Sequence, residues 1–149
     1  MEKMGRAMTE DVTYPEIRRE LLHYIYALAN TDYQYENWIT RKSWSEDEKD
    51  SLDFCIHFLF DDTNLASDPE ASIGILLLNK EEAGAINRIT SALNEVLDSN
   101  GSDEEDLTYL RSPQWVKVIE TARAALKIFR MDPTAVGCTN RAASFLYIF

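Results

Sequence analysis

The sequence predicts an α+β fold, namely a helix-rich single domain with three or four main helices packed on a small β-sheet or hairpin. Apolar residues recur at helical spacing over three long stretches, whereas residues 52–60 alternate with the period of a strand. With 149 residues and 45% hydrophobic content, the chain is long enough to form one domain, residues 1–149, around a sizeable core.

The first predicted helix runs from Thr13 to about Ala29. Thr13 and Glu16 have the spacing of a capping box, and the apolar positions that follow recur every three or four residues. Asn30 interrupts this pattern and is suited to cap a short helix after it. Residues 1–12 contain no such pattern, and we expect a flexible leader there.

Two more long helices are predicted, over residues 79–98 and 112–132. Asn79 and Glu82 form a second plausible capping box, and Ser112 is followed by a proline that suits the first turn of a helix. A short helix through Leu110 is expected between them, because Ser102 and the acidic residues after it can cap one.

The predicted β-structure centres on residues 52–60. As a strand, this segment would place five large apolar side chains on one face: Leu52, Phe54, Ile56, Phe58 and Phe60. The apolar run from Ile73 to Leu78 is either a second strand or one or two buried helical turns, and we favour the strand. Residues 134–149 end in five apolar side chains, so we expect this C-terminal tail to pack on the core.

Charge is the clearest functional signal. The net charge is -11, and residues 1–106 carry 24 acidic and 9 basic side chains, whereas residues 107–149 carry 2 acidic and 6 basic ones. An acidic body repels nucleic acid and anionic membranes at long range and attracts basic proteins. We therefore expect no direct binding to nucleic acid or membranes, although solubility alone also explains many acidic proteins.

The sequence favours a cytoplasmic protein. No apolar run approaches the roughly 18 residues that cross a bilayer, and the N-terminus lacks the apolar core of a signal peptide. The two cysteines, Cys55 and Cys138, are too few for a disulfide framework.

No catalytic, cofactor or metal site is predicted, and we expect a protein that is not an enzyme. Cys55 and His57 would share a strand face, but no second pair of metal ligands accompanies them. There is no nucleophile elbow, and the five glycines never cluster into a phosphate-binding loop.

Acidic clusters are the candidate binding residues. They are Asp61, Asp62, Asp68 and Glu70 after the predicted strand, and Asp103, Glu104, Glu105 and Asp106 at the start of the short helix. The alternatives are a solvated loop, protein contact, or acid–base or metal chemistry at Asp61 and Asp62 with the help of His57. Tyr33 and Trp44 are candidate partner-facing anchors, because aromatic residues dominate binding hot spots.

Several short motifs in residues 14–129 carry a family resemblance. They include Pro15–Glu20, Phe60–Thr63, Asp68-Pro69 and Ser112–Trp115. The chain resembles a small family of bacterial cytosolic proteins that are similar to immunity proteins of polymorphic toxins, including those of contact-dependent growth inhibition. The tail after Asp132 departs from the family pattern.

The resemblance implies an immunity protein that neutralises a cognate toxin by blocking its active or partner-binding surface. For the oligomeric state, which the sequence leaves open, we favour a monomer. The expected toxin is a basic nuclease, and an acidic inhibitor suits it because complementary charge raises the association rate. The alternative is a regulatory or adaptor domain with a different protein partner.

Overall fold

The structure is a computed structural model that describes residues 12–40, 51–101 and 103–130. Over these residues the fold is all-α and contains no strand, so the predicted α+β class is wrong. The helices are α1 (Pro15–Ala29), α2 (Thr31–Gln34), the π-helix η3 (Tyr35–Ile39), α3 (Leu52–His57), the π-helix η4 (Phe58–Asp62), the 3₁₀-helix η5 (Pro69–Ser72), α4 (Lys80–Asn100), α5 (Asp106–Leu110) and α6 (Trp115–Ile128).

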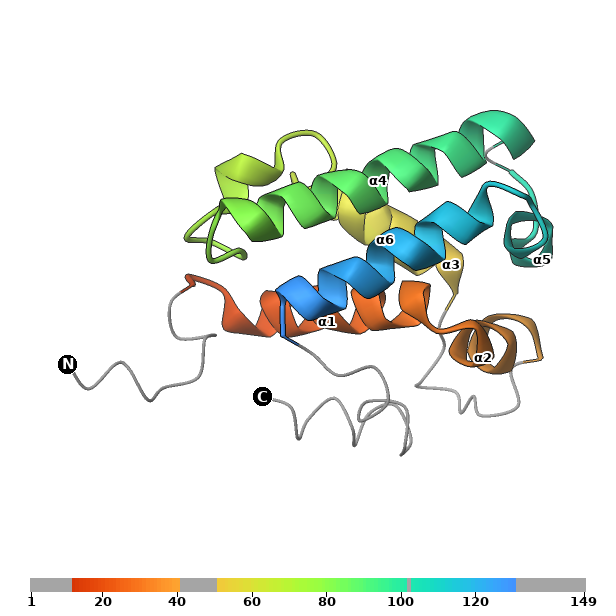
Figure 1. The fold of residues 1–149 in the computed structure, drawn as a ribbon, viewed down its shortest axis with the longest axis horizontal. Helices are drawn as coiled ribbons and strands as arrows, with labels where there is room; N and C mark the ends of the chain where they lie inside the picture. The colour runs from red at the N-terminus through yellow and green to blue at the C-terminus, as the bar shows by residue number, and fades with distance from the viewer. Residues whose placement is uncertain (1–11, 41–50, 102, 131–149) are drawn as a thin grey trace.

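Helix α6 packs against both α1 and α4 and forms the centre of the bundle (Figure 1). Helices α1 and α4 run in the same direction and α6 runs in the opposite one, while α3 lies behind α4 and α6 in this view. The three long helices are those predicted from the sequence, and their buried faces join the apolar side of α3 in one hydrophobic core.

Helix α1 is the most deeply buried element, because every residue from Leu21 to Ala29 lies in the interior. Its last carbonyl groups need hydrogen-bond donors, since a helix end leaves four of them unpaired. The buried amide of Gln34 donates to Ala27 O at 2.8 Å and to Leu28 O at 2.9 Å. Its oxygen accepts from Trp115 Nε1 at 3.1 Å, so Gln34 ties the end of α1 to the start of α6.

The predicted capping box at Thr13 does not form, because the N-cap residue is Tyr14 and it makes no side-chain cap. The backbone amides of Thr13 and Tyr14 donate instead to Gly74 O and Ile75 O, each at 3.1 Å. The start of α1 is therefore held by a segment about sixty residues further along the chain.

The cap at Asn79 is confirmed, since its Oδ1 accepts from the backbone amide of Glu82 at 3.0 Å. The Glu82 side chain has a different partner from the one a capping box would give it. It forms two hydrogen bonds of 2.9 Å with the guanidinium of Arg18, and both side chains are almost fully buried. Arg18 also donates to Leu76 O at 2.9 Å and lies 5.1 Å from the centre of the Phe129 ring.

Residues 52–60 are helical, so the predicted strand is wrong. Leu52, Cys55 and Leu59 have the i, i+3, i+7 spacing of a helix face, and all three are buried. Ser51 Oγ accepts from Phe54 N at 3.3 Å and caps α3. A lone strand would leave its backbone groups unpaired, whereas a helix satisfies most of them within the segment.

The strand favoured over Ile73–Leu78 is also absent. This segment contains one isolated bridge between Ile73 and Leu77, within a turn in which Gly74 has a φ of +88°. Ser72 O accepts from the amides of residues 75, 76 and 77 at 2.9 to 3.0 Å, so the segment closes on itself. Residues 1–11 of the predicted leader and the predicted tail packing over residues 134–149 lie outside the described residues.

Candidate protein-binding surface

The outward side of α3 and η4 presents four exposed side chains, Asp53, Phe54, His57 and Asp61, which we call the α3 face. Residues three and four apart in a helix lie on the same side, so Asp53, His57 and Asp61 form a line. Phe54 is 46% exposed, which makes it one of the few large apolar side chains that the described surface displays. The α3 face therefore combines an aromatic ring with carboxylates.

His57 lies between the two carboxylates of this face. Its Nδ1 is 2.6 Å from Asp61 Oδ2, and its Nε2 is 3.6 Å from Asp53 Oδ2. The hydrogen bond to Asp61 and the charge of Asp53 raise the pKa of His57, with smaller contributions from the charges of Asp61 and Asp62. More than half of each of the three side chains is exposed to solvent, so a partner can reach all of them.

The last two residues of the acidic segment 103–106, Glu105 and Asp106, lie beside the start of the α3 face. Asp106 Oδ2 accepts from the backbone amide of Leu52 at 3.1 Å, so a side chain of α5 caps α3. An open cavity of about 510 Å³ lies at this junction and is lined by Trp38, Ile39, Ser51, Asp53, Glu105, Asp106 and Leu107. Two acidic regions that are far apart in sequence thus meet at Asp53.

The remaining predicted carboxylates are distributed differently. Asp62 is exposed at the end of η4, next to the α3 face. Asp68 and Glu70 are also exposed, but they belong to η5, which packs against α4. In Figure 1, η5 lies beside the beginning of α4 and α5 lies beside its end, so the predicted acidic residues do not form one surface.

The prediction that Tyr33 is a partner-facing anchor is wrong, because its side chain is buried and only 5% exposed. Its ring packs edge-on against His23, Tyr26 and Trp38, and its hydroxyl lies 3.2 Å from His23 Nε2. Trp44 lies outside the described residues.

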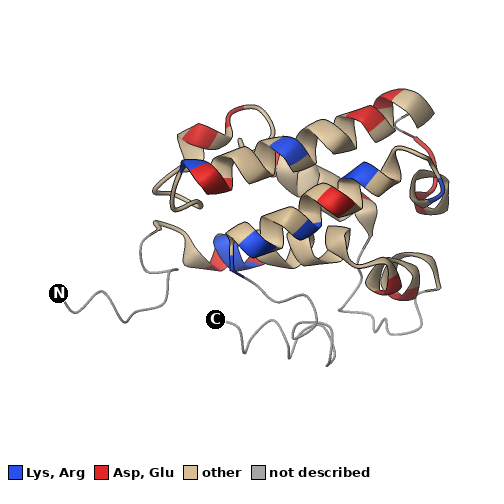
Figure 2. Cartoon of the chain, viewed as in Figure 1, with Lys and Arg blue, Asp and Glu red and all other residues tan. Residues whose placement is uncertain are grey.

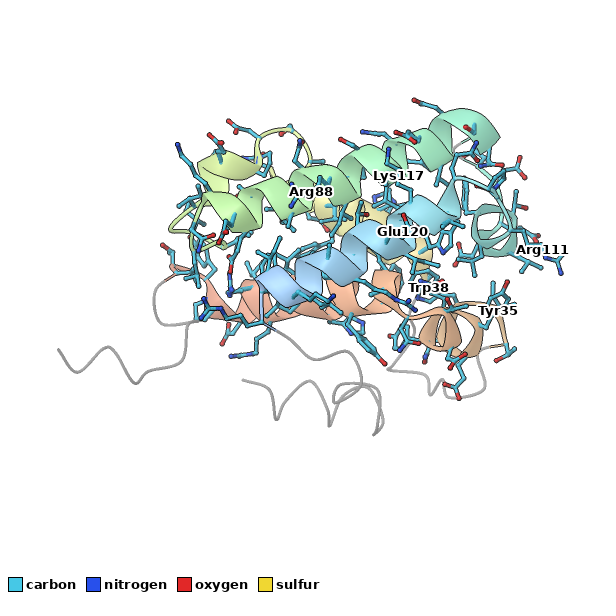
Figure 3. All side chains as sticks on the ribbon, in the orientation of Figure 1. Tyr35, Trp38, Arg88, Arg111, Lys117 and Glu120 are labelled. Carbon is cyan, nitrogen blue, oxygen red and sulfur yellow. The ribbon has the colours of Figure 1, made fainter. Side chains whose placement is uncertain are left out.

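Tyr35 and Trp38 come from the same π-helix and have different environments (Figure 3). Trp38 is buried with its ring 6.4 Å from that of Trp115, whereas Tyr35 is 37% exposed. The same short helix therefore supplies one core aromatic residue and one that is partly exposed.

No group of three or more His, Cys, Asp or Glu side chains in the described part of the chain is arranged to hold a metal ion. The shared face predicted for Cys55 and His57 is lost in a helix, where residues two apart point in nearly opposite directions. Cys55 is fully buried, whereas His57 is exposed.

The side of the molecule seen in Figure 2 carries charges of both signs. Lys and Arg appear along α6 and in the middle of α4, and Asp or Glu appears in the middle of α6 and at both ends of α4. Lys117 of α6 pairs with Glu95 of α4 at 3.2 Å, and Figure 3 labels Lys117 and Glu120 on α6 and Arg88 on α4. This view of the molecule is therefore of mixed charge, and the acidic α3 face belongs to a helix that lies behind it.

Sequence reasoning missed Asp53 and Phe54, because a strand would have placed Phe54 on the buried face. The signal that identifies them is the polar cap residue Ser51 followed by Leu52, Cys55 and Leu59 at helical spacing. On that pattern, Asp53 and Phe54 fall on the outer side.

The chain belongs to the DUF7945 family, which is described as a domain of unknown function and whose profile matches residues 12–136. The search of curated proteins and the search of solved structures gave no match. Among the described residues, no helix has both the length and the apolar character that crossing a membrane requires.

Proposed function

We propose that this chain is a cytoplasmic immunity protein that binds a basic toxin domain, which we expect from its charge to be a nuclease, in a one-to-one complex. The bound chain covers the active or partner-binding surface of the toxin. The observation that carries the proposal is the α3 face, where exposed Phe54 lies among Asp53, His57 and Asp61. The net charge of -11 and the resemblance of the sequence motifs to immunity proteins support the same partner class.

The two chemical parts of this face have different roles in the proposed complex. Carboxylates attract a cationic partner over long distances and raise its association rate, with an effect that salt weakens. An aromatic side chain that becomes buried at an interface slows dissociation, because its apolar surface is removed from water. Phe54 thus replaces Tyr33 as the proposed aromatic contact.

The proposed contact surface extends from the α3 face to its acidic neighbours. Asp62 lies at one end, and Glu105 lines the cavity at the other end, with exposed Asp103 and Glu104 just before it in the chain. Asp68 and Glu70 are on η5 and are omitted from this surface, which makes them a matched control. We propose that the inhibitor acts as a monomer.

The first test is to express the tagged protein in its native host and identify what it retains, alongside co-expression with the reading frame next to its gene. We expect a stable one-to-one complex with a basic protein whose toxicity the chain suppresses. Capture of a partner that is not toxic would replace the proposal with an adaptor function. Two gene products that migrate separately would contradict it.

The second test is charge reversal at the proposed surface. Asp53→Lys combined with Asp61→Lys should lower the association rate of the captured complex by about tenfold or more at low salt, because steered association depends on local charge. Stopped-flow mixing at increasing salt measures this effect.

Asp68→Lys combined with Glu70→Lys is the control, because it changes the net charge by the same amount elsewhere on the molecule. This pair should slow association much less. Equal slowing by both pairs would show that only the total charge matters, and would remove the α3 face from the interface.

A further inference from the structure

We propose that His57 makes docking on the α3 face sensitive to pH, because its imidazolium occupies the carboxylates that a cationic partner needs. The protonated ring acts as an internal counter-ion, and a lysine or arginine of the partner takes its place. This inference rests on the proposed function and names how that same surface is regulated.

The geometry places the ring between two carboxylates, Asp53 and Asp61. A cation of the partner would compete with the ring for both of them. Each carboxylate lies about one helical turn from His57, and each faces a different ring nitrogen, Asp61 at 2.6 Å and Asp53 at 3.6 Å. When both nitrogens are protonated, Nδ1 donates to Asp61, and the positive ring attracts the carboxylate of Asp53 across 3.6 Å. A partner's cation must then displace the ring from Asp53, from Asp61, or from both.

The groups that act on His57 favour its charged form. Asp53, Asp61 and Asp62 all come from its own helical segment and raise its pKa, whereas desolvation opposes them. The neighbouring helix α5 adds Glu105 and Asp106 near Asp53, at the cavity. No lysine or arginine of the described residues forms an ion pair with Asp53 or Asp61.

The sign of the pH effect follows from competition. Below the pKa of His57 the ring is positive and offsets part of the acidic charge, so docking of a cation is weakened. Above that pKa the ring is neutral and the full charge of the carboxylates is available. Docking therefore strengthens as pH rises, and binding of the cation releases a proton from His57.

One charge at the surface has a limited effect. At separations of 4 to 6 Å in a solvent-exposed site, it changes affinity by a factor of about three to ten, and salt reduces this factor. We expect an affinity gain of that size between pH 5.5 and pH 8.5.

The test uses the full chain and a synthetic octalysine peptide as the cationic probe. NMR titration of the His57 ring signals should show a lower pKa when octalysine is present, because the peptide competes for Asp53 and Asp61. The ring of His23, which is buried beside Tyr33, is the internal control and should not respond. An unchanged or raised pKa of His57 would overturn the inference.

Two variants of His57 show whether the charge of its ring, and not that of another titrating group, causes the pH dependence of binding. His57→Gln is neutral at every pH and should bind octalysine tightly at both pH 5.5 and pH 8.5. His57→Arg is always charged and should bind weakly at both, while the native chain changes from weak to tight. Equal pH profiles for the native chain and His57→Gln would also overturn the inference.

The same variants distinguish this inference from the proposed function. If octalysine competes with His57 but the host yields no basic toxin, the pH-sensitive surface stands and the immunity function fails. If the captured toxin binds with the same pH profile to the native chain and to His57→Gln, the immunity function stands and the role of His57 is wrong.

Discussion

This protein has one buried and one exposed ionic cluster. The buried cluster joins distant segments of the fold, and the exposed cluster leaves its charges accessible to another molecule. Arg18 and Glu82 meet in the core with relative exposures of 1% and 2%, and two parallel hydrogen bonds of 2.9 Å join them. Asp53, His57 and Asp61 meet in solvent, with side-chain exposures of 71%, 56% and 60%. The first cluster ties distant segments together, whereas the second lies along one helix.

The difference shows which charges are free to act on another molecule. Glu82 also accepts from the amide of Leu78 at 2.8 Å, and Arg18 also donates to Leu76 O, so the buried pair has its partners within the fold. Removing one buried charge leaves the other uncompensated in a medium of low dielectric constant. The exposed cluster keeps water around its carboxylates, and a partner can replace that water.

The largest predicted effect concerns the buried cluster. Arg18→Met should lower the free energy of unfolding by about 3–5 kcal/mol, because Glu82 would remain charged and buried without its guanidinium. Urea unfolding followed by circular dichroism measures this loss. Arg19→Met, at the neighbouring and more exposed position, is the control and should change it by about 0.5 kcal/mol or less.

A double variant sharpens this prediction. Arg18→Met with Glu82→Leu removes both charges, so it should be less destabilising than Arg18→Met alone, although Leu78 N loses an acceptor. A double variant that is much less stable than the single one would show that the hydrogen bonds to the backbone, and not the charge pairing, dominate this cluster.

An intermediate effect is expected where α5 meets the exposed cluster. Asp106→Ala should lower the free energy of unfolding by about 1 kcal/mol, since Leu52 N at the start of α3 loses its acceptor. Hydrogen exchange should become faster at the first amides of α3. Asp103→Ala, an exposed residue of the same segment, should leave both measurements unchanged.

The smallest effect concerns stability and His57. Its pKa in the folded state is raised above the ordinary value of 6.5, chiefly by the hydrogen bond to Asp61 and the charge of Asp53. The charged ring of His57 therefore stabilises the folded state. This contribution is complete below the ordinary pKa and is lost as pH rises through the raised pKa of the folded state.

Melting temperatures measure this effect. The native chain should be slightly more stable than His57→Gln at pH 5.5, and the difference should disappear at pH 8.5. Because the cluster is exposed, added salt should reduce the difference. A difference that grows with pH would mean that the ring is held in its neutral form.

Helix prediction succeeded where local signals were sufficient. Asn79 and the apolar stripe after it located α4, and Asn30 located the break after α1, with Asn30 Oδ1 accepting from Tyr33 N at 2.8 Å. Capping failed at Thr13, because the amides there found partners in residues 74 and 75. No local pattern contains that information.

The residues of the proposed surface were anticipated from the sequence only in part. Asp61, Asp62 and Asp103–Glu105 are exposed and remain candidate contacts, whereas Tyr33 is buried, and Asp53 and Phe54 were not among the candidates. In residues 52–60, a strand period and a helix period both fit the apolar positions, since apolar residues outnumber polar ones. That ambiguity decided which side chains were expected on the surface.

Propensity, capping and composition are local properties, so the three long helices, the acidic charge and its imbalance along the chain could all be predicted from the amino-acid sequence. The helical state of residues 52–60, the pairing of Arg18 with Glu82 and the position of Asp53 beside Glu105 and Asp106 became evident only in the folded chain. These outcomes depend on contacts between residues far apart in the chain. A side chain is buried or paired in this way only when helix packing brings the two distant segments into contact.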